Sequence, residues 1–348
     1  MPSFRAGAVT EILEARPGLQ RVLVDLGSGP EHAYVLTDLI GSVATGDRVV
    51  VNTTAVQLGL GTGGWHVVHW NLEREAWTNT DTRAGMKLRY TSLQLDVAHS
   101  EPGDVTTVNR MPVVAAGLHS QVAAIAAAFK HSRPNGRLVY VMTDGGALPI
   151  AISDLVCELR ARGLIDATVT CGHAFGGDFE AVSIYGGLAI ARWVAEADVA
   201  VVAMGPGSAG SGSSLGFSGI EVGAVLDATT SLDGIPIAAL RVSFADPRPR
   251  HQGVSHHSLT TLSVATRSRV TVPLPCVGGV DEAQIRRDLA RTGIDALHDI
   301  VDVEPVGALQ LLDAAGIEVE SMGRPAAADP VLFEAGAVAG AVAARAVP

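Results

Sequence analysis

The sequence predicts an α/β protein with a mostly parallel sheet flanked by helices, preceded by a small β-barrel-like domain. From residue 111 onward, apolar runs of strand length alternate with helical patterns. Residues 1–72 contain short β-branched runs between glycine-rich turns, with no helical pattern among them. Hydrophobic residues make up 47% of the 348-residue chain and aromatic residues only 4%, so aliphatic side chains must fill helix-on-sheet layers.

The N-terminal segment, 1–72, is predicted to be a small β-rich domain. Its strand-like runs are 21–26, 33–36 and 48–52, and the glycine-rich stretch 52–66 closes the barrel. Glycines within 59–64 are typical of turns more than of a phosphate loop. Residues 73–110 are polar and rich in turn formers, which predicts a linker with one extended segment at 86–90.

The remaining segment, 111–348, is predicted to be the α/β domain. Strands are expected at 113–118, 138–142, 167–171, 199–204 and 236–244, with helices at 122–129, 151–160, 180–194, 220–232 and 259–265. Continuous apolar strands between helices indicate a parallel sheet covered on both faces. Residues 299–321 are expected to add one more βαβ unit, and a C-terminal helix follows from 329.

Polar side chains follow the predicted strands, where ligands bind in open parallel sheets. Candidates for acid–base catalysis or metal binding are His119, Asp144, His173, Asp178, Asp246 and His256. Each also has a structural explanation, because a histidine can be a satisfied structural residue and an aspartate can cap a helix. The adjacent His256 and His257 are expected to point in different directions on a helix, so at most one of them should face a given ligand.

Two kinds of ligand fit these loops. Histidine and aspartate from separate loops could hold a divalent metal, although no short metal-binding motif is present and the cofactor remains unknown. Arg248 and Arg250, beside His251, could instead clamp a small anionic ligand through paired donors. A solvated surface turn is the structural alternative for this arginine pair.

Two glycine patterns follow the predicted strand 199–204. Gly205, Gly207 and Gly210 match G-x-G-x-x-G, but no helix begins directly after them, so we predict a phosphate-binding nest that includes Ser208 and not a nicotinamide site. Residues 212–216 match G-x-S-x-G around Ser214. Asp246 and His256 follow in the order found in α/β-hydrolases, but the strand ends about ten residues too early for a nucleophile elbow.

Composition and charge restrict the partners and the compartment. A net charge of -11 and a pI near 5.4 disfavour nucleic acid and anionic membranes as partners. Three widely spaced cysteines fit a reducing compartment, and the longest apolar runs are far shorter than a bilayer span. The sequence therefore predicts a cytoplasmic protein with a small anionic ligand, and it leaves a homo-oligomer open.

Several longer motifs resemble those of one bacterial family. They are Asn52-Thr-Thr-Ala with the glycine-rich stretch 58–64, the segments 86–91 and 140–145, Gly172-His-Ala-Phe-Gly-Gly-Asp, Gly216-Phe-Ser-Gly-Ile-Glu, and Ser243-Phe-Ala-Asp-Pro-Arg with Ser255-His-His. The chain resembles, over nearly its whole length, the family catalogued as domain of unknown function 3866. The resemblance implies one functional unit of bacterial origin and brings no activity, substrate or catalytic residue.

Three hypotheses of function follow. The first is an enzyme, a hydrolase or transferase, that acts on a small anionic or phosphorylated substrate at the C-terminal strand ends. The second is a non-catalytic sensor or binding module for a small ligand. The third is a serine hydrolase that uses Ser214.

Overall fold

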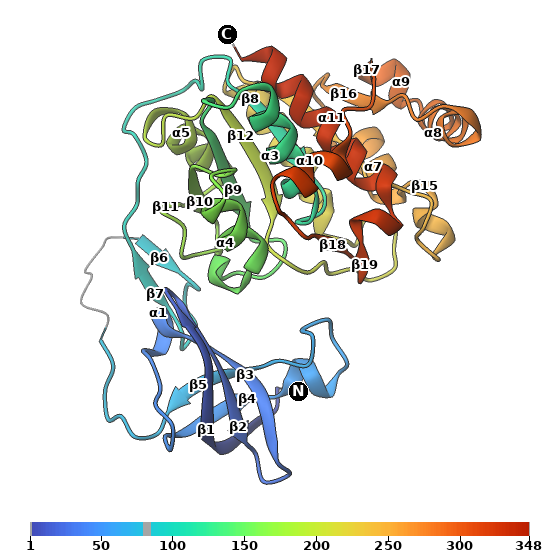
Figure 1. Ribbon diagram of the computed structural model, residues 1–348. Coiled ribbons are helices and arrows are strands. Elements are labelled where there is room, and N and C mark those ends of the chain that lie inside the picture. Colours follow the sequence, from blue (N-terminus) through green and yellow to red (C-terminus); the bar gives the residue numbers. More distant parts are fainter. Residues whose placement is uncertain (1, 79–84, 348) are drawn as a thin grey trace. The chain divides into compact units, whose positions relative to one another are not determined.

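The computed structural model describes residues 2–78 and 85–347. The chain forms two compact units, Met1–Ala98 and His99–Pro348. In the first unit, five strands close into a barrel in the order β1-β2-β3-β5-β4, which confirms the predicted barrel (Figure 1). The strands are β1 (Phe4–Arg16), β2 (Leu19–Asp25), β3 (Pro30–Leu36), β4 (Arg48–Asn52) and β5 (His66–Asn71).

The barrel interior is filled by alternating valines. Val22 and Val24 of β2 and Val49 and Val51 of β4 are fully buried, while the residues between them are at least partly exposed. This period of two is the pattern of a sheet with one face packed and one in water. Two one-turn helices, α1 (Thr37–Ile40) and α2 (Thr54–Gln57), lie in the connections before and after β4.

The segment that follows the barrel contains two short strands. β6 (Gly85–Lys87) pairs antiparallel with β7 (Leu95–Val97), and both belong to the first unit. The extended segment expected at 86–90 is a strand only as far as Lys87. Leu88 and Tyr90 have positive φ values of 48° and 59°, which ends the extended backbone.

The second unit is built on a sheet of eight parallel strands in the order β11-β10-β9-β12-β8-β13-β16-β17. This confirms the predicted α/β class with a parallel sheet. The strands are β8 (Pro112–Ala116), β9 (Leu138–Thr143), β10 (Ala167–Cys171), β11 (Phe179–Ala181), β12 (Val199–Met204), β13 (Ile235–Ala239), β16 (Thr271–Pro275) and β17 (Asp299–Val303).

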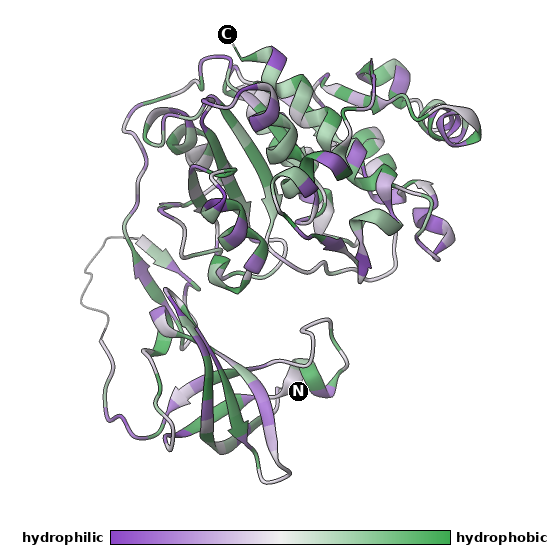
Figure 2. Ribbon diagram, viewed as in Figure 1, coloured by the Kyte–Doolittle hydropathy of each residue, from purple (hydrophilic) through white to green (hydrophobic). Residues whose placement is uncertain are grey.

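Helices cover both faces of this sheet (Figure 1). One face packs against α3 (Gln121–Ser132), α4 (Asp154–Ala161), α10 (Ala308–Ala314) and α11 (Pro330–Ala346). The other packs against α5 (Ile184–Trp193), α6 (Val222–Ser231), α7 (His256–Thr260), α8 (Gly279–Arg291) and α9 (Ile294–Leu297). Val114 faces the first layer, whereas Val113 and Ala115 face the second, so the central strands are hydrophobic along their length (Figure 2).

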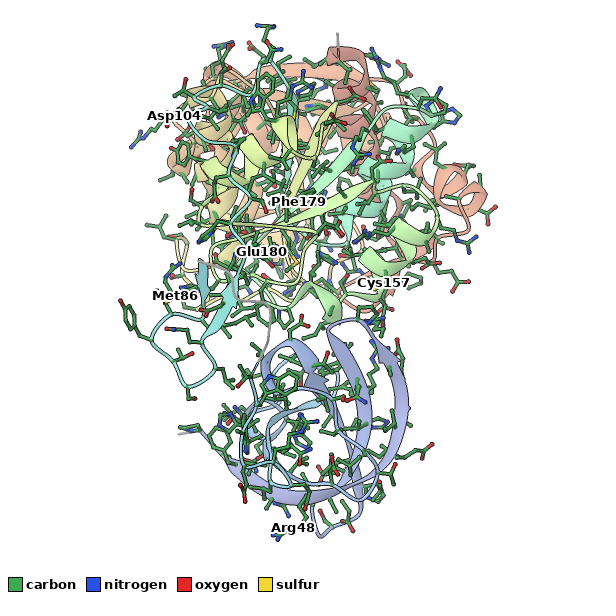
Figure 3. All side chains as sticks on the ribbon, turned by 90° about the vertical axis from the view of Figure 1, so that its left-hand side faces the viewer. Arg48, Met86, Asp104, Cys157, Phe179 and Glu180 are labelled. Atoms are coloured by element: carbon green, nitrogen blue, oxygen red, sulfur yellow. The ribbon has the colours of Figure 1, made fainter. Side chains whose placement is uncertain are left out.

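The helix expected at 180–194 begins later than predicted. Glu180 lies with Phe179 on the edge strand β11 (Figure 3), and α5 begins at Ile184. The Glu180 carboxylate accepts hydrogen bonds from the Thr170 hydroxyl at 2.6 Å and from the Gly176 amide at 2.7 Å. These hydrogen bonds keep Glu180 in the sheet, although glutamate has a low propensity for strands.

The C-terminal third differs most from expectation. β16 and α8 were not predicted, and the final βαβ unit was wrong, because β17 pairs with β16 while residues 320–321 do not join the sheet. Instead, β18 (Glu320–Ser321) pairs with β19 (Arg324–Pro325) around Met322 and Gly323, which both have positive φ values. In the part of the chain that the structure describes, no helix has the length and hydrophobicity to span a membrane.

The order of the strands creates a crevice at the carboxyl edge of the sheet. β8 leads into α3 on one face, whereas the neighbouring β12 leads into α6 on the other face. Loops that leave adjacent strands toward opposite faces open a gap between them, and ligands of α/β proteins bind in such gaps. The topology therefore directs attention to the loops after β8, β12 and β13.

Candidate functional site

A pocket of about 190 Å³ lies at this edge of the sheet. Two segments supply nearly all of its lining: residues 205–217, named here the Gly/Ser loop, and residues 241–257, named the Arg/His segment. The lining residues are Ser208, Ala209, Gly210, Gly212, Ser213, Gly216, Phe217, Arg241, Arg248, Arg250, His251, His256, His257 and Met322. The two loops that sequence reasoning assigned to anion binding therefore meet in one cavity.

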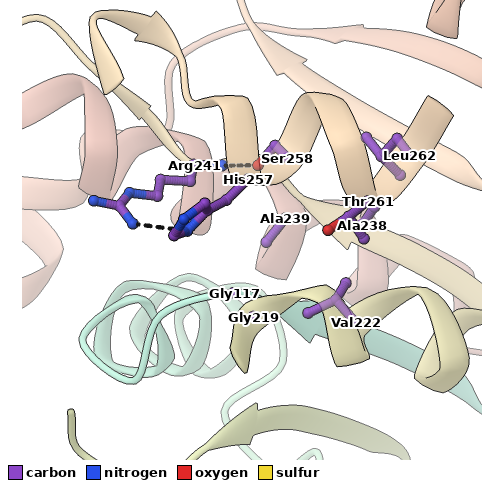
Figure 4. Close-up of a pocket in the computed structure, with 10 residues that line it drawn as sticks. All are labelled: Gly117, Gly219, Val222, Ala238, Ala239, Arg241, His257, Ser258, Thr261 and Leu262. Carbon is purple, nitrogen blue, oxygen red and sulfur yellow. Dashed lines mark hydrogen bonds between the residues drawn. The ribbon is translucent and has the colours of Figure 1, made fainter. Parts of the chain in front are cut away.

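A smaller apolar pocket of about 20 Å³ shares Arg241 and His257 with the first (Figure 4). Gly117, directly after β8, and Gly219 and Val222, directly before and in α6, contribute to its lining. A space of this volume accepts about one water-sized group. The two pockets together place the site at the ends of β8, β12 and β13.

The Arg/His segment is folded back on itself. β14 (Val242–Ser243) pairs antiparallel with β15 (Gly253–Val254), and the Ser255 amide donates to the Arg241 carbonyl at 2.9 Å. This pairing brings Arg241, near the end of β13, against the first turn of α7. Its Nη1 lies 3.3 Å from Nδ1 of His257.

Asp246 anchors the arginines of the pocket. Its side chain is fully buried, and its two carboxylate oxygens accept from Nε and Nη2 of Arg248 at 2.9 and 2.7 Å. Arg241 and Arg324 each place a terminal nitrogen 3.5–3.6 Å from the same carboxylate. The hydrogen bonds from Arg248 outweigh burial and hold the pKa of Asp246 well below its usual range. This geometry makes Asp246 a positioning group for guanidinium groups.

Three histidine rings cluster beside the arginines, and both His256 and His257 line the pocket, which differs from the expectation that at most one of them would face a ligand. One ring nitrogen from each of His251, His256 and His257 lies within 4.8 Å of the others. Ser255 caps α7 by accepting from the His257 amide, and its hydroxyl also lies 2.7 Å from Nδ1 of His251. The His257 ring stacks on Phe217 with centroids 4.0 Å apart. Ser255, close in the chain, therefore holds the His251 ring, whereas Phe217, from the Gly/Ser loop, holds the His257 ring.

The charge around these rings keeps them neutral. Burial and the positive charge of Arg241 lower the pKa of both His251 and His257 to about 3. Burial and Arg250 also lower the pKa of His256. Burial lowers the pKa of Arg241 only to about 10, so this guanidinium stays charged near neutral pH. The pocket therefore presents neutral imidazoles together with cationic arginines.

The Gly/Ser loop forms the opposite wall. Gly205 has no room for a side chain, because a Cβ there would lie 2.2 Å from the Ala147 carbonyl oxygen. Gly207 and Gly212 have φ values of 90° and 80°, which favour glycine. The predicted Ser208 and Gly210 line the pocket, while Gly205 and Gly207 shape the loop behind it.

His119 lies outside both pockets. Its Nε2 is 2.7 Å from the Ser153 hydroxyl, and its Nδ1 is 3.1 Å from both the Tyr140 hydroxyl and the Met204 carbonyl. Burial lowers its pKa to about 4. The ring thus connects the end of β12 with β9 and with the N-cap of α4, which fits the structural alternative stated for this residue.

Asp144 and His173 lie together, but neither lines either pocket. The Asp144 carboxylate accepts from the His173 amide at 2.9 Å. Sequence reasoning missed their neighbour Glu221, which is hydrogen-bonded to the Thr143 hydroxyl. Burial, with a smaller contribution from Asp144, raises the pKa of Glu221 to about 7. Its signal in the sequence was an acidic residue in the first turn of the predicted helix 220–232, just after a glycine-rich loop.

Asp178 is far from the carboxyl edge. Its carboxylate accepts from the amide and the hydroxyl of Thr168, near the start of β10, at 2.8 and 2.9 Å. It also pairs with Arg160 of α4 at 2.9 Å. These contacts fix the turn before β11, so the residue is placed for a structural role.

The arrangement required of a serine hydrolase is not formed in the described residues. Ser214 is exposed within the Gly/Ser loop, ten residues beyond the end of β12. Both oxygens of Asp246 are bound by Arg248, and no hydrogen bond joins Ser214, Asp246 and His256 among the described side chains. The carboxylate that would orient a catalytic histidine is therefore occupied.

The fold and the site together define an α/β protein with an arginine- and histidine-lined pocket at the carboxyl edge of a parallel sheet. The family model described as "Protein of unknown function (DUF3866)" matches residues 32–340. The chain belongs to this family, as its motifs predicted. Comparisons with curated proteins and with solved structures gave no match.

Proposed function

We propose that this protein is an enzyme, a hydrolase or transferase, that binds a small phosphorylated or carboxylated substrate in the pocket between the Gly/Ser loop and the Arg/His segment. The observation that carries the proposal is the convergence of Arg241, Arg248 and Arg250 on one cavity. Guanidinium groups bind carboxylate and phosphate oxygens through paired donors, which makes arginine the usual ligand for such anions.

The local charge supports an anionic ligand although the whole chain is acidic. Arg241, Arg248 and Arg250 line the pocket, and Arg324 lies next to them at Asp246. The carboxylates that pair with arginines of this group are Asp246 and Asp329. The difference leaves an excess of positive charge inside a protein with a net charge of -11. A cleft of one sign attracts small ions of the opposite sign.

The size of the cavity limits the substrate. Its volume of about 190 Å³ is below the roughly 300–1,000 Å³ of pockets that hold drug-sized ligands.

In phosphoryl and acyl transfer, negative charge builds up on oxygen, and donors already in place at that oxygen stabilise the transition state. Arg241 and Arg248 are arranged for this task because Asp246 holds them before any ligand arrives.

The test uses Arg250, whose side chain is exposed, so that its substitution leaves the core intact. Binding of inorganic phosphate to the full chain is measured by calorimetry for the unmodified protein, Arg250→Gln and Arg250→Lys. Loss of one charge-assisted hydrogen bond of about 1.5–3 kcal/mol weakens binding roughly 10- to 100-fold in Arg250→Gln. Arg250→Lys keeps the charge but loses the paired donors, so its affinity falls between the two.

The matched control is Arg345→Gln. Arg345 is also exposed, but it lies fifteen residues beyond the start of α11, roughly 22 Å along the helix axis. Equal losses in Arg250→Gln and Arg345→Gln, or no phosphate binding at all, would overturn the assigned site. Turnover is then assayed with p-nitrophenyl phosphate and acetyl phosphate. Phosphate binding without turnover of any phosphate ester or acyl phosphate supports the non-catalytic binding module instead.

A further inference from the structure

The histidine cluster has a feature that anion binding does not explain. His251 is 1% exposed and lies with His256 and His257 so that one ring nitrogen of each is within 4.8 Å of the others. Nε2 of His256 is buried and has no hydrogen-bond partner among the described residues. A buried polar atom without a partner costs about 1–3 kcal/mol, and a ligand bound at Nε2 of His256 would offset this cost.

The surroundings of the cluster orient the rings toward one another. The Ser255 hydroxyl lies 2.7 Å from Nδ1 of His251, which leaves Nε2 of that ring directed away from Ser255. Phe217 holds the His257 ring in a parallel stack. Metal-binding histidines are fixed in this way, with the second ring nitrogen or the ring face held by a neighbouring group.

We propose that His251, His256 and His257 form a binding centre for a divalent transition metal of the zinc class, and that it is filled together with the anion of the pocket. Nitrogen ligands suit Zn²⁺, Fe²⁺ and Co²⁺, whereas Mg²⁺ and Ca²⁺ prefer oxygen. Tetrahedral ligands about 2.0 Å from a metal lie roughly 3.3 Å apart, so the rings must move closer together and Nε2 of His251 must leave Arg250 when the metal binds. Three protein ligands leave a fourth position open to a substrate oxygen.

The arginines determine how the metal binds. Arg250 donates from Nε to Nε2 of His251 at 3.3 Å, and Arg241 approaches Nδ1 of His257 at the same distance. Their positive charge opposes a cation, and an anion bound by the same arginines offsets that repulsion. The metal and the anion therefore assist each other, and the coupling must be equal in both directions. This coupled half of the inference rests on the proposed function, whereas the metal centre itself does not.

The experiment uses Co²⁺, whose visible absorption reports its coordination, added to the full chain after treatment with a chelator. We expect one Co²⁺ per chain, and about tenfold tighter binding in the presence of methylphosphonate. His256→Ala and His257→Ala should each weaken Co²⁺ binding at least about 10-fold. His131→Ala, which alters an exposed histidine of α3, should leave it unchanged.

The variant Arg250→Gln distinguishes binding of the metal from binding of the anion. Without methylphosphonate it should bind Co²⁺ more tightly than the unmodified protein, because one opposing charge is gone, while its phosphate binding is weaker. Phosphate binding with no Co²⁺ binding would overturn the metal centre and leave the proposed function intact. Co²⁺ binding with no phosphate binding would overturn the coupling and the proposed function. If the histidine variants fail to fold, the stoichiometry and spectrum of the unmodified protein still decide the outcome.

Discussion

Replacement of His119 by Gln should change how the stability of the protein depends on pH. In the folded protein the pKa of His119 is lowered to about 4 from an ordinary value of 6.5 because the ring is buried. Between these values the unfolded chain binds a proton that the folded chain does not. The stability contributed by neutral His119 is therefore complete above about pH 6.5 and is lost as the pH falls through 4. Tyr140, its titratable neighbour, has a raised pKa and stays neutral throughout.

The magnitude follows from the two pKa values. At about 1.36 kcal/mol per pH unit, lowering the pKa from 6.5 to about 4 removes roughly 2.5 kcal/mol between about pH 7.5 and about pH 4.5. His119→Gln lacks this titration. Near pH 7.5 the variant should have a lower free energy of unfolding than the unmodified protein, because the hydrogen bonds to Ser153 and Met204 are lost. This difference in free energy should narrow or reverse near pH 4.5.

The assay is urea unfolding followed by far-UV circular dichroism at these two pH values, which avoid the pI near 5.4 where proteins tend to associate. The quantity compared is the difference in free energy of unfolding between the unmodified protein and His119→Gln, because other groups titrate in both. His131→Gln, on the surface of α3, is the control for the effect of replacing a histidine by glutamine. A difference between protein and variant that stays constant from about pH 7.5 to about pH 4.5 would refute the reasoning.

Two further predictions concern the same unit. Burial raises the pKa of Glu221 from 4.5 to about 7, so its protonated form stabilises the fold below pH 4.5 and this contribution is lost as the pH rises through 7. In urea unfolding, Glu221→Gln should lack this contribution to the pH dependence of the free energy of unfolding. The same pH dependence in the variant and the unmodified protein would contradict the prediction. Gly340→Ala should destabilise the protein by about 1–3 kcal/mol, because its Cβ would lie 2.2 Å from the Ile125 carbonyl oxygen. Helix propensity alone predicts that Gly340→Ala raises the free energy of unfolding by up to about 1 kcal/mol. Such an increase would contradict the close packing of Gly340 against Ile125.

The parts of the fold that could be predicted from the sequence are those with a clear local pattern. The short β-branched runs at β2 and β4, separated by glycine-rich turns, predicted the barrel, and the apolar run at β12 predicted a buried parallel strand. β16 was missed because it contains two prolines, Pro273 and Pro275, which argue against a strand. The segment 317–321 was misassigned because a short apolar run looks alike in a sheet strand and in a small hairpin.

The candidate site was predictable where its residues are close in the chain. Arg248, Arg250 and His256 lie within nine residues, and their loop follows a strand, so proximity was visible in the sequence. The position of Arg241 against His257 depends on the pairing of β14 with β15, and Phe217 arrives from another loop. No local pattern encodes contacts of this kind, because they depend on how separate elements pack.

The sequence by itself determined the class of fold, the edge of the sheet where polar loops gather, and the arginine–histidine composition of one loop. Those properties follow from hydrophobic period and from residue order, which are local. Only the tertiary structure decided that Asp246 is bound by Arg248 and that His119 is held by Ser153. It also decided that Glu221 and Asp144 lie next to each other. Burial and neighbouring charge set the chemistry of an ionisable group, and both arise only when distant segments meet.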